Sequence, residues 1–199
     1  MAAGGDLQAE SLLLAYRSGI FPWPHPGLPL LWFCPPKRAV LEFKDLHIAR
    51  SLAQARRRLP FEYTMDSAFR EVITSCARAP RPGQGGTWIT SRMIEGYCRL
   101  HRLGHAHSVE VWEAGRLAGG IYGVDADGAF SGESMFYLKP CASKLALLRL
   151  IEHLKSRGLE WLDIQVMTPH MKAMGAKVIP REEFLKKLAR TRLLGLRLF

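Results

Sequence analysis

The chain has 199 residues, and its 28 Lys and Arg against 18 Asp and Glu give a formal net charge of +10. Its four cysteines form no C-x-x-C pair, no apolar run is long enough to span a bilayer, and the first residues do not form a signal peptide. These features exclude a disulfide-rich secreted domain and a membrane-spanning protein. We expect a cytoplasmic protein with free thiols and no membrane partner.

The first part of the chain predicts a small α+β unit. Asp6 is placed to cap a short apolar helix, and a proline-rich stretch after that helix predicts an irregular loop. A strand over 40–43 and a helical repeat of apolar residues over 48–59 follow. The composition then changes, which predicts a small N-terminal domain over residues 1–59 and a second domain over residues 60–199.

The second part predicts an antiparallel sheet between helices. Asp66 and Thr90 are placed to begin the first two helices. Alternating apolar residues and tight turns then predict three strands, over 106–113, 117–124 and 129–136. The remaining predicted elements are a helix over 143–157, a strand over 161–166 and a helix over 182–189. The fold class is therefore α+β, and its element order resembles the GNAT acyltransferase fold.

The segment before the long helix tests for an acyl-CoA donor. Phosphate binding at this place in a GNAT fold needs glycines that expose backbone N–H groups. Residues 137–144 contain a proline and no glycine. Gly83-Gln84-Gly85-Gly86 is glycine-rich, but no Lys-Ser/Thr pair follows it, so it predicts a loop. Neither CoA nor a nucleotide cofactor is expected.

Basic residues gather in three parts of the chain. A positive surplus favours a polyanion such as nucleic acid, because binding releases counterions. The groups are Arg50 with Arg56, Arg57 and Arg58; Arg78 with Arg81; and Lys186, Lys187, Arg190, Arg192 and Arg197. The same groups also suit an ordinary solvated surface.

Polar residues inside two apolar strands form the candidate site. Glu133 and Asp163 lie where an unpartnered carboxylate is costly to bury. Strand alternation places Asp163 and Gln165 on one face, where the carboxylate can orient the neighbouring amide. These side chains predict either a functional site or a buried group satisfied for structural reasons.

Seven motifs in sequence order carry a resemblance to a known family. They are Gly4-Gly5-Asp6-Leu7, Tyr16 with Gly19-Ile20-Phe21-Pro22-Trp23, Gly86-Thr87-Trp88-Ile89, Leu100-His101 with the segment from Gly104 to Trp112, Gly119-Gly120-Ile121-Tyr122-Gly123, Gly132-Glu133-Ser134-Met135-Phe136 and Asp163-Ile164-Gln165. Through them nearly the whole chain resembles the leucyl/phenylalanyl-tRNA-protein transferases of the bacterial N-degron pathway. The resemblance implies a small N-terminal domain beside a GNAT-like catalytic domain.

The resemblance implies transfer of Leu or Phe, with Met as a further candidate, from aminoacyl-tRNA to proteins that begin with Arg or Lys. The new peptide bond marks those proteins for degradation. Gln165 is expected to accept an N–H from the attacking α-amine, Asp163 to polarise Gln165, and Glu133 to hold the cationic acceptor. Little acid–base power is needed, because about a tenth of an α-amine is neutral at pH 7. Alignment of amine and ester supplies up to about 7–11 kcal/mol. The ribose hydroxyl of the tRNA is an alternative proton carrier.

The resemblance also implies binding surfaces for the donor. A pocket for the donor side chain or the terminal adenine is expected from Trp23, Trp88, Ile121, Phe130 and Met135. Any one of these side chains can equally be ordinary core. Arg56, Arg57 and Arg58 are expected to contact the tRNA.

No metal is expected at His101, His105 and His107, because Gly104 interrupts them and no Cys or carboxylate stands at zinc spacing. We expect no cofactor and a monomer. Two other functions stay open: a CoA-dependent GNAT acetyltransferase, and a non-catalytic module that binds tRNA or protein N-termini.

Overall fold

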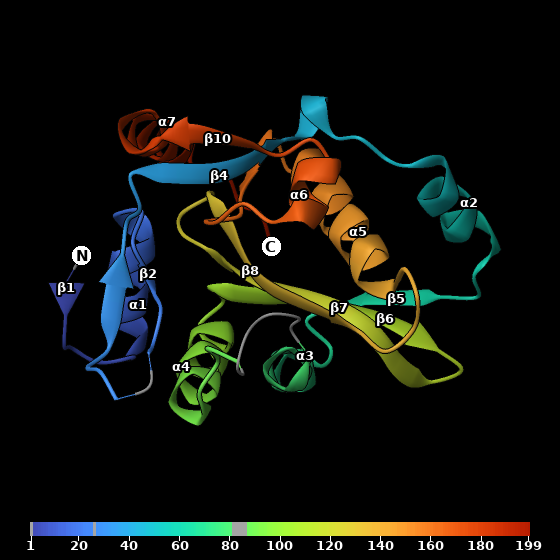
Figure 1. Ribbon diagram of the computed structural model, residues 1–199, viewed down its shortest axis with the longest axis horizontal. Coiled ribbons are helices and arrows are strands. Elements are labelled where there is room, and N and C mark those ends of the chain that lie inside the picture. Colours follow the sequence, from blue (N-terminus) through green and yellow to red (C-terminus); the bar gives the residue numbers. More distant parts are fainter. Residues whose placement is uncertain (1, 26, 81–86) are drawn as a thin grey trace.

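The computed structural model describes residues 2–25, 27–80 and 87–199, which form a larger and a smaller sheet with helices packed around them (Figure 1). The larger sheet has seven strands in the order β10-β4-β9-β8-β7-β6-β5. Its strands are β4 (Lys37–Glu42), β5 (Glu62–Met65), β6 (Ala106–Glu113), β7 (Arg116–Asp125), β8 (Phe130–Tyr137), β9 (Trp161–Asp163) and β10 (Lys177–Pro180). Neighbouring strands are antiparallel except β8 and β9, which are parallel and whose register holds one pair, Ser131 with Asp163.

The smaller sheet belongs to the N-terminal segment. Its strands, in the order β1-β3-β2, are β1 (Ala2–Ala3), β2 (Phe21–Pro22) and β3 (Leu31–Phe33), and α1 (Ala9–Arg17) lies beside them. β4 comes before the boundary predicted at 59–60, and it lies inside the larger sheet between β9 and β10. The division into domains 1–59 and 60–199 stays a prediction.

Helices cover both faces of the larger sheet (Figure 1). α3 (Phe69–Arg78) and α4 (Ser91–Arg102) lie on one face, and α5 (Ala142–Ser156) and α6 (Pro169–Ala173) lie on the other. Two adjacent glycines of β7 allow this close approach. A Cβ atom at Gly119 would lie 2.6 Å from Cβ of Ala142 in α5, and one at Gly120 would lie 3.2 Å from Cγ2 of Val72 in α3.

Two apolar cores follow from this layering. One packs α5 against the sheet, and the other packs α1, α3 and α4 against the opposite face. The remaining helical elements are a 3₁₀ turn (Phe43–Asp45), α2 (Arg50–Arg58) and α7 (Arg181–Leu193). Across 2–25, 27–80 and 87–199, no helix has both the length and the apolar character that crossing a membrane requires.

Most predicted elements are confirmed, including the fold class, the three-stranded meander and the long helix α5. Thr90 caps α4 by accepting a hydrogen bond from the Met93 N–H at 3.3 Å. The cap expected from Asp66 is wrong, because α3 begins after Ala68 without a side-chain cap. Asp66 instead binds His107 and the Ser108 N–H. The strand expected over 161–166 ends at Asp163.

Candidate active site

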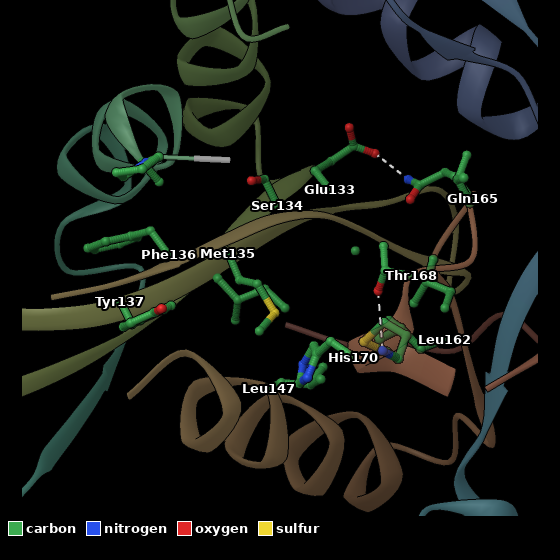
Figure 2. A pocket seen from close by; sticks show the side chains of 17 residues that line it. Glu133, Ser134, Met135, Phe136, Tyr137, Leu147, Leu162, Gln165, Thr168 and His170 are labelled. Atoms are coloured by element: carbon green, nitrogen blue, oxygen red, sulfur yellow. Dashed lines mark hydrogen bonds between the residues drawn. The ribbon is translucent and has the colours of Figure 1, made fainter. Parts of the chain in front are cut away.

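The site lies where β8 and β9 separate. Beyond the Ser131–Asp163 pair the two strands diverge, and a cavity of ≈ 690 Å³ opens between them. Figure 2 shows Glu133 and Gln165 facing each other at one end of this cavity, with Met135, Leu147 and His170 farther along it. Because the two strands separate while each stays paired with its other neighbour, side chains from both can face the cavity between them.

A smaller cavity of ≈ 180 Å³ adjoins the first. Its own walls include Phe21, Pro22, Trp23 and Trp88. Both cavities share Glu133, Ile164, Gln165, Val166 and Thr168. Glu133 and Gln165 therefore border an apolar space on one side and an aromatic space on the other.

Gln165 has an unusual backbone conformation. Its φ is 53°, in the left-handed region, and the Val166 N–H donates to the Ile164 carbonyl at 2.6 Å across it. This hydrogen bond makes Gln165 the centre of a γ-turn, a strained geometry that costs about 1–3 kcal/mol and persists only where other contacts hold it. The turn ends β9 and aims the Gln165 side chain toward Glu133.

Asp163 binds the backbone N–H of Gln165 and not its side-chain amide. Oδ1 of Asp163 accepts the Gln165 N–H at 3.0 Å. The predicted contact between the carboxylate and the Gln165 side-chain amide is therefore wrong, because the γ-turn replaces the strand alternation on which it depended. The partner of the amide is Glu133, whose Oε1 accepts from Nε2 of Gln165 at 2.6 Å.

Glu133 sits at an irregularity in β8. The register with β7 passes from Ser134 opposite Tyr122 to Gly132 opposite Gly123, so Glu133 is the extra residue of a β-bulge. Bulges next to active sites commonly redirect one side chain. Here the bulge carries the carboxylate to the junction of the two cavities.

Two buried tyrosines complete the surroundings of Glu133. The Tyr97 hydroxyl donates to Oε2 of Glu133 at 3.2 Å, and it lies 2.5 Å from the Tyr16 hydroxyl. Burial raises the pKa of both tyrosines well above 10, so both stay neutral. Burial also raises the pKa of Glu133 to about 7, against the lowering effect of the tyrosine hydroxyls. At neutral pH Glu133 therefore exists in both protonation states.

This pKa predicts how stability depends on pH. Folded Glu133 binds its proton more tightly than the unfolded chain, where its pKa is about 4.5, so its ionisation destabilises the fold as pH rises from about 4.5 to 7. Relative to wild type, we expect Glu133→Gln to gain about 1–2 kcal/mol of unfolding free energy between pH 5 and pH 8. This is less than the full pKa shift corresponds to, because the half-buried carboxylate keeps part of its hydration. Urea unfolding at both pH values measures this difference.

Glu95→Gln is a suitable control for that measurement. In the wild type, the exposed carboxylate of Glu95 binds Arg70 at 2.8 Å, which lowers the Glu95 pKa. Its stability difference from wild type should therefore be nearly equal at pH 5 and pH 8. The same constant difference for Glu133→Gln would contradict the raised pKa of Glu133.

Arg38, which the sequence analysis did not identify, completes the site. Nε and Nη2 of Arg38 donate to Oδ1 and Oδ2 of Asp163 at 2.8 and 2.6 Å, and Ser131 Oγ donates to Oδ2 at 2.9 Å. Arg38 is 1% exposed. Lys37 and Arg38 both precede an apolar run, so local sequence does not show which of them is buried.

The predicted pocket residues divide between the two cavities. Trp23 and Trp88 line the smaller one, and Ile121 and Met135, which are opposite each other on β7 and β8, line the larger one. Phe130 lines neither cavity in the part of the chain that the structure describes. It is buried in the core, because it lies before the bulge on β8 and packs 5.7 Å from the Phe199 ring.

The wall of the larger cavity also includes a histidine that the sequence did not indicate. His170 of α6 lies in its wall, and burial lowers the pKa of this imidazole. Its Nε2 atom has no hydrogen-bond partner among the described residues.

Other predicted residues lie apart from these cavities. Arg56, Arg57 and Arg58 are exposed on α2, which Figure 1 places at the opposite end of the molecule from β2. Nη1 of Arg56 binds Oε1 of Glu152 in α5 at 2.5 Å. The glycine-rich segment 83–86 and Arg81 lie outside the described residues. In the described ranges no cluster of three His, Cys, Asp or Glu side chains is arranged to hold a metal.

Comparison with known proteins gives consistent matches along the chain. The family model described as leucyl/phenylalanyl-tRNA protein transferase matches residues 40–189, and that of its N-terminal domain matches residues 5–36. A leucyl/phenylalanyl-tRNA–protein transferase of Anaeromyxobacter sp. (strain K) is 53% identical over 190 residues, which cover 96% of this chain and 82% of the relative. One of Nitratidesulfovibrio vulgaris (strain DP4) is 51% identical, with 93% and 79% covered.

Solved structures are more distant. A GCN5-related N-acetyltransferase-like protein from Streptococcus suis is similar with a TM-score of 0.42 and 13% identity, covering 86% of this chain and 64% of that one.

Proposed function

The chain belongs to the leucyl/phenylalanyl-tRNA protein transferase family, and we propose on that premise that it transfers Leu or Phe from aminoacyl-tRNA to the α-amine of proteins that begin with Arg or Lys. The observation that supports this most is the Gln165–Glu133 pair at the junction of two cavities. Transfer between two substrates requires one point that both can reach.

The larger cavity suits the donor side chain. Its lining includes Ile121, Met135, Leu147, Leu162 and Met171. Such a surface accepts Leu, Phe or Met, and it separates donors that differ by one methylene by about 1–3 kcal/mol. The smaller cavity offers Trp23 and Trp88, on which the terminal adenine of the tRNA can stack.

Gln165 aligns the attacking amine. Since its Nε2 donates to Glu133, its Oε1 is left to accept an N–H from the amine. In its ionised form, Glu133 attracts the acceptor terminus, which carries the cationic side chain of Arg or Lys. Asp163 acts on the amine only through the γ-turn, because its oxygens already accept four hydrogen bonds.

The reaction then needs one proton transfer. The amine nitrogen bonds to the ester carbonyl carbon, the bond from that carbon to the ribose oxygen breaks, and the amine proton passes to the departing ribose oxygen. Gln165 is not a base and Glu133 is assigned to hold the acceptor, so we assign the proton transfer to the ribose hydroxyl. Most of the rate gain is expected from alignment of the two substrates.

An acetyltransferase that uses CoA is the second candidate. The turn before α5 contains Pro140 and begins the helix at Cys141 with φ 69°. One backbone N–H at the start of α5, that of Ala142, already donates to the Lys139 carbonyl at 3.2 Å. Pro140 has no N–H and that of Ala142 is already bonded, so two backbone groups at this turn cannot bind a pyrophosphate.

We further propose that the protein works as a cytoplasmic monomer and that the added residue marks its targets for degradation.

The test of aminoacyl transfer uses purified protein, Phe-tRNA and a peptide that begins with Arg, without added cofactor. Mass spectrometry should find the peptide heavier by one Phe, attached to its α-amine. Bound Phe-tRNA without this product would favour a non-catalytic binding module, and thermal stabilisation by CoA would favour an acetyltransferase.

A further inference from the structure

The buried side chain of Arg38 contacts three other parts of the chain, which are β9, the segment after α1, and α7. It lies on β4, its Nη1 donates to the Gly19 carbonyl after α1 at 3.1 Å, and its guanidinium lies over the rings of Phe21 and Phe184 at 4.7 and 4.4 Å. Arg38 lines neither cavity. Arg38 therefore acts on the reaction only through its neighbours, of which Asp163 holds Gln165 and Phe21 lines the smaller cavity.

The carboxylate of Asp163 is fully used. Oδ1 accepts from Arg38 Nε and the Gln165 N–H, and Oδ2 accepts from Arg38 Nη2 and Ser131 Oγ. A carboxylate offers about four acceptor positions, so none is left for a substrate proton. Two of the four bonds come from Arg38, and its rigid fork fixes the plane of the carboxylate.

We propose that Arg38 is a positioning residue for aminoacyl transfer. It orients the buried carboxylate of Asp163, and Asp163 in turn holds the N–H of Gln165 in the γ-turn that aims the side-chain amide at Glu133. A strained turn needs such support, because it relaxes when its anchors loosen. This assignment rests on the proposed function, and it gives the N-terminal segment a role in the geometry of the reaction through the Gly19 carbonyl.

Arg38→Lys tests the proposal, because it keeps the charge and removes the fork. A small displacement of a catalytic group can cost about 10²-fold in rate. We therefore expect kcat to fall about 10–100-fold, with KM for Phe-tRNA and for the Arg peptide within about twofold of wild type. Arg38→Gln removes the charge as well, and its kcat should be lower still.

A double-mutant cycle separates positioning from general stability. If Arg38 acts through Asp163, then Arg38→Lys combined with Asp163→Asn loses about as much kcat as the more damaging single change. If Arg38 is only structural, the two losses multiply. Arg17→Lys is the matched control, since Arg17 binds Asp127 through Nε and Nη2 at 2.9 and 2.7 Å, away from both cavities. It should leave kcat unchanged.

Hydrogen exchange makes the test independent of activity. The Gln165 amide should exchange faster in Arg38→Lys than in wild type, while amides of β6 and β7 keep their rates. This result would support positioning even in a preparation that transfers nothing, a failure that would count against the proposed function instead. Wild-type kcat, multiplied losses in the cycle, or an unchanged Gln165 exchange rate would each overturn the proposal.

Discussion

Replacing Gln165 by alanine should lower kcat for transfer about 10²-fold or more and change the Kd for Phe-tRNA less than about threefold. The side chain supplies an amide oxygen at the junction of the two cavities, and that oxygen meets the amine only in the reacting complex. Single-turnover transfer and filter binding measure the two quantities.

Gln165→Asn is the control for the backbone. Asparagine tolerates a left-handed φ better than most residues, so it should keep the γ-turn, but its shorter side chain cannot reach Glu133 in the same way. A loss of kcat similar to that of alanine would assign the effect to the position of the amide. Equal losses of kcat and of tRNA affinity in Gln165→Ala would show that the residue serves the fold.

Reversing charge at Arg57 and Arg58 together should weaken Phe-tRNA binding about 10–100-fold in low salt and reduce the slope of log K against log salt by about 1.4–1.8. Each phosphate contact contributes about 0.7–0.9 to that slope, and both arginines are exposed. Arg56 is left intact because it binds Glu152. Binding measured from 50 to 200 mM salt gives the slope.

Charge reversal on α7 provides the comparison. Lys186 and Arg190 are also exposed basic residues, and Figure 1 places α7 and α2 at different ends of the molecule. Lys186→Glu with Arg190→Glu should leave the slope nearly unchanged. If this pair lowers the slope and the α2 pair does not, the tRNA lies along α7 instead.

Local sequence patterns were sufficient for the elements that local chemistry determines. The strands from β6 to β8 are joined by tight turns, and Ala114 and Gly115 form the first of these turns with positive φ values. The pairing of β4 with β9 joins residues such as Val40 and Asp163, far apart in the sequence. No periodicity encodes such a pairing, so the position of β4 in the larger sheet could not be predicted.

The candidate site could likewise be predicted only in part from local sequence patterns. Glu133, Asp163 and Gln165 were identifiable as polar residues among apolar neighbours, and the structure brings them together. Their contacts were not identifiable, because the alternation continues through Val166 while tertiary hydrogen bonds impose a γ-turn at Gln165. Arg38 shares its sequence context with the exposed Lys37, and only the position of Asp163 on the adjacent strand explains its burial.

The most direct test of the central claim is the transfer of radiolabelled Leu or Phe from charged tRNA to four peptides that begin with Arg, Lys, Asp or Ala. The account predicts label on the Arg and Lys peptides and none on the Asp and Ala peptides, since ionised Glu133 attracts the positively charged side chain that Arg and Lys carry and Asp and Ala lack. No label on any peptide while the tRNA stays charged would contradict it.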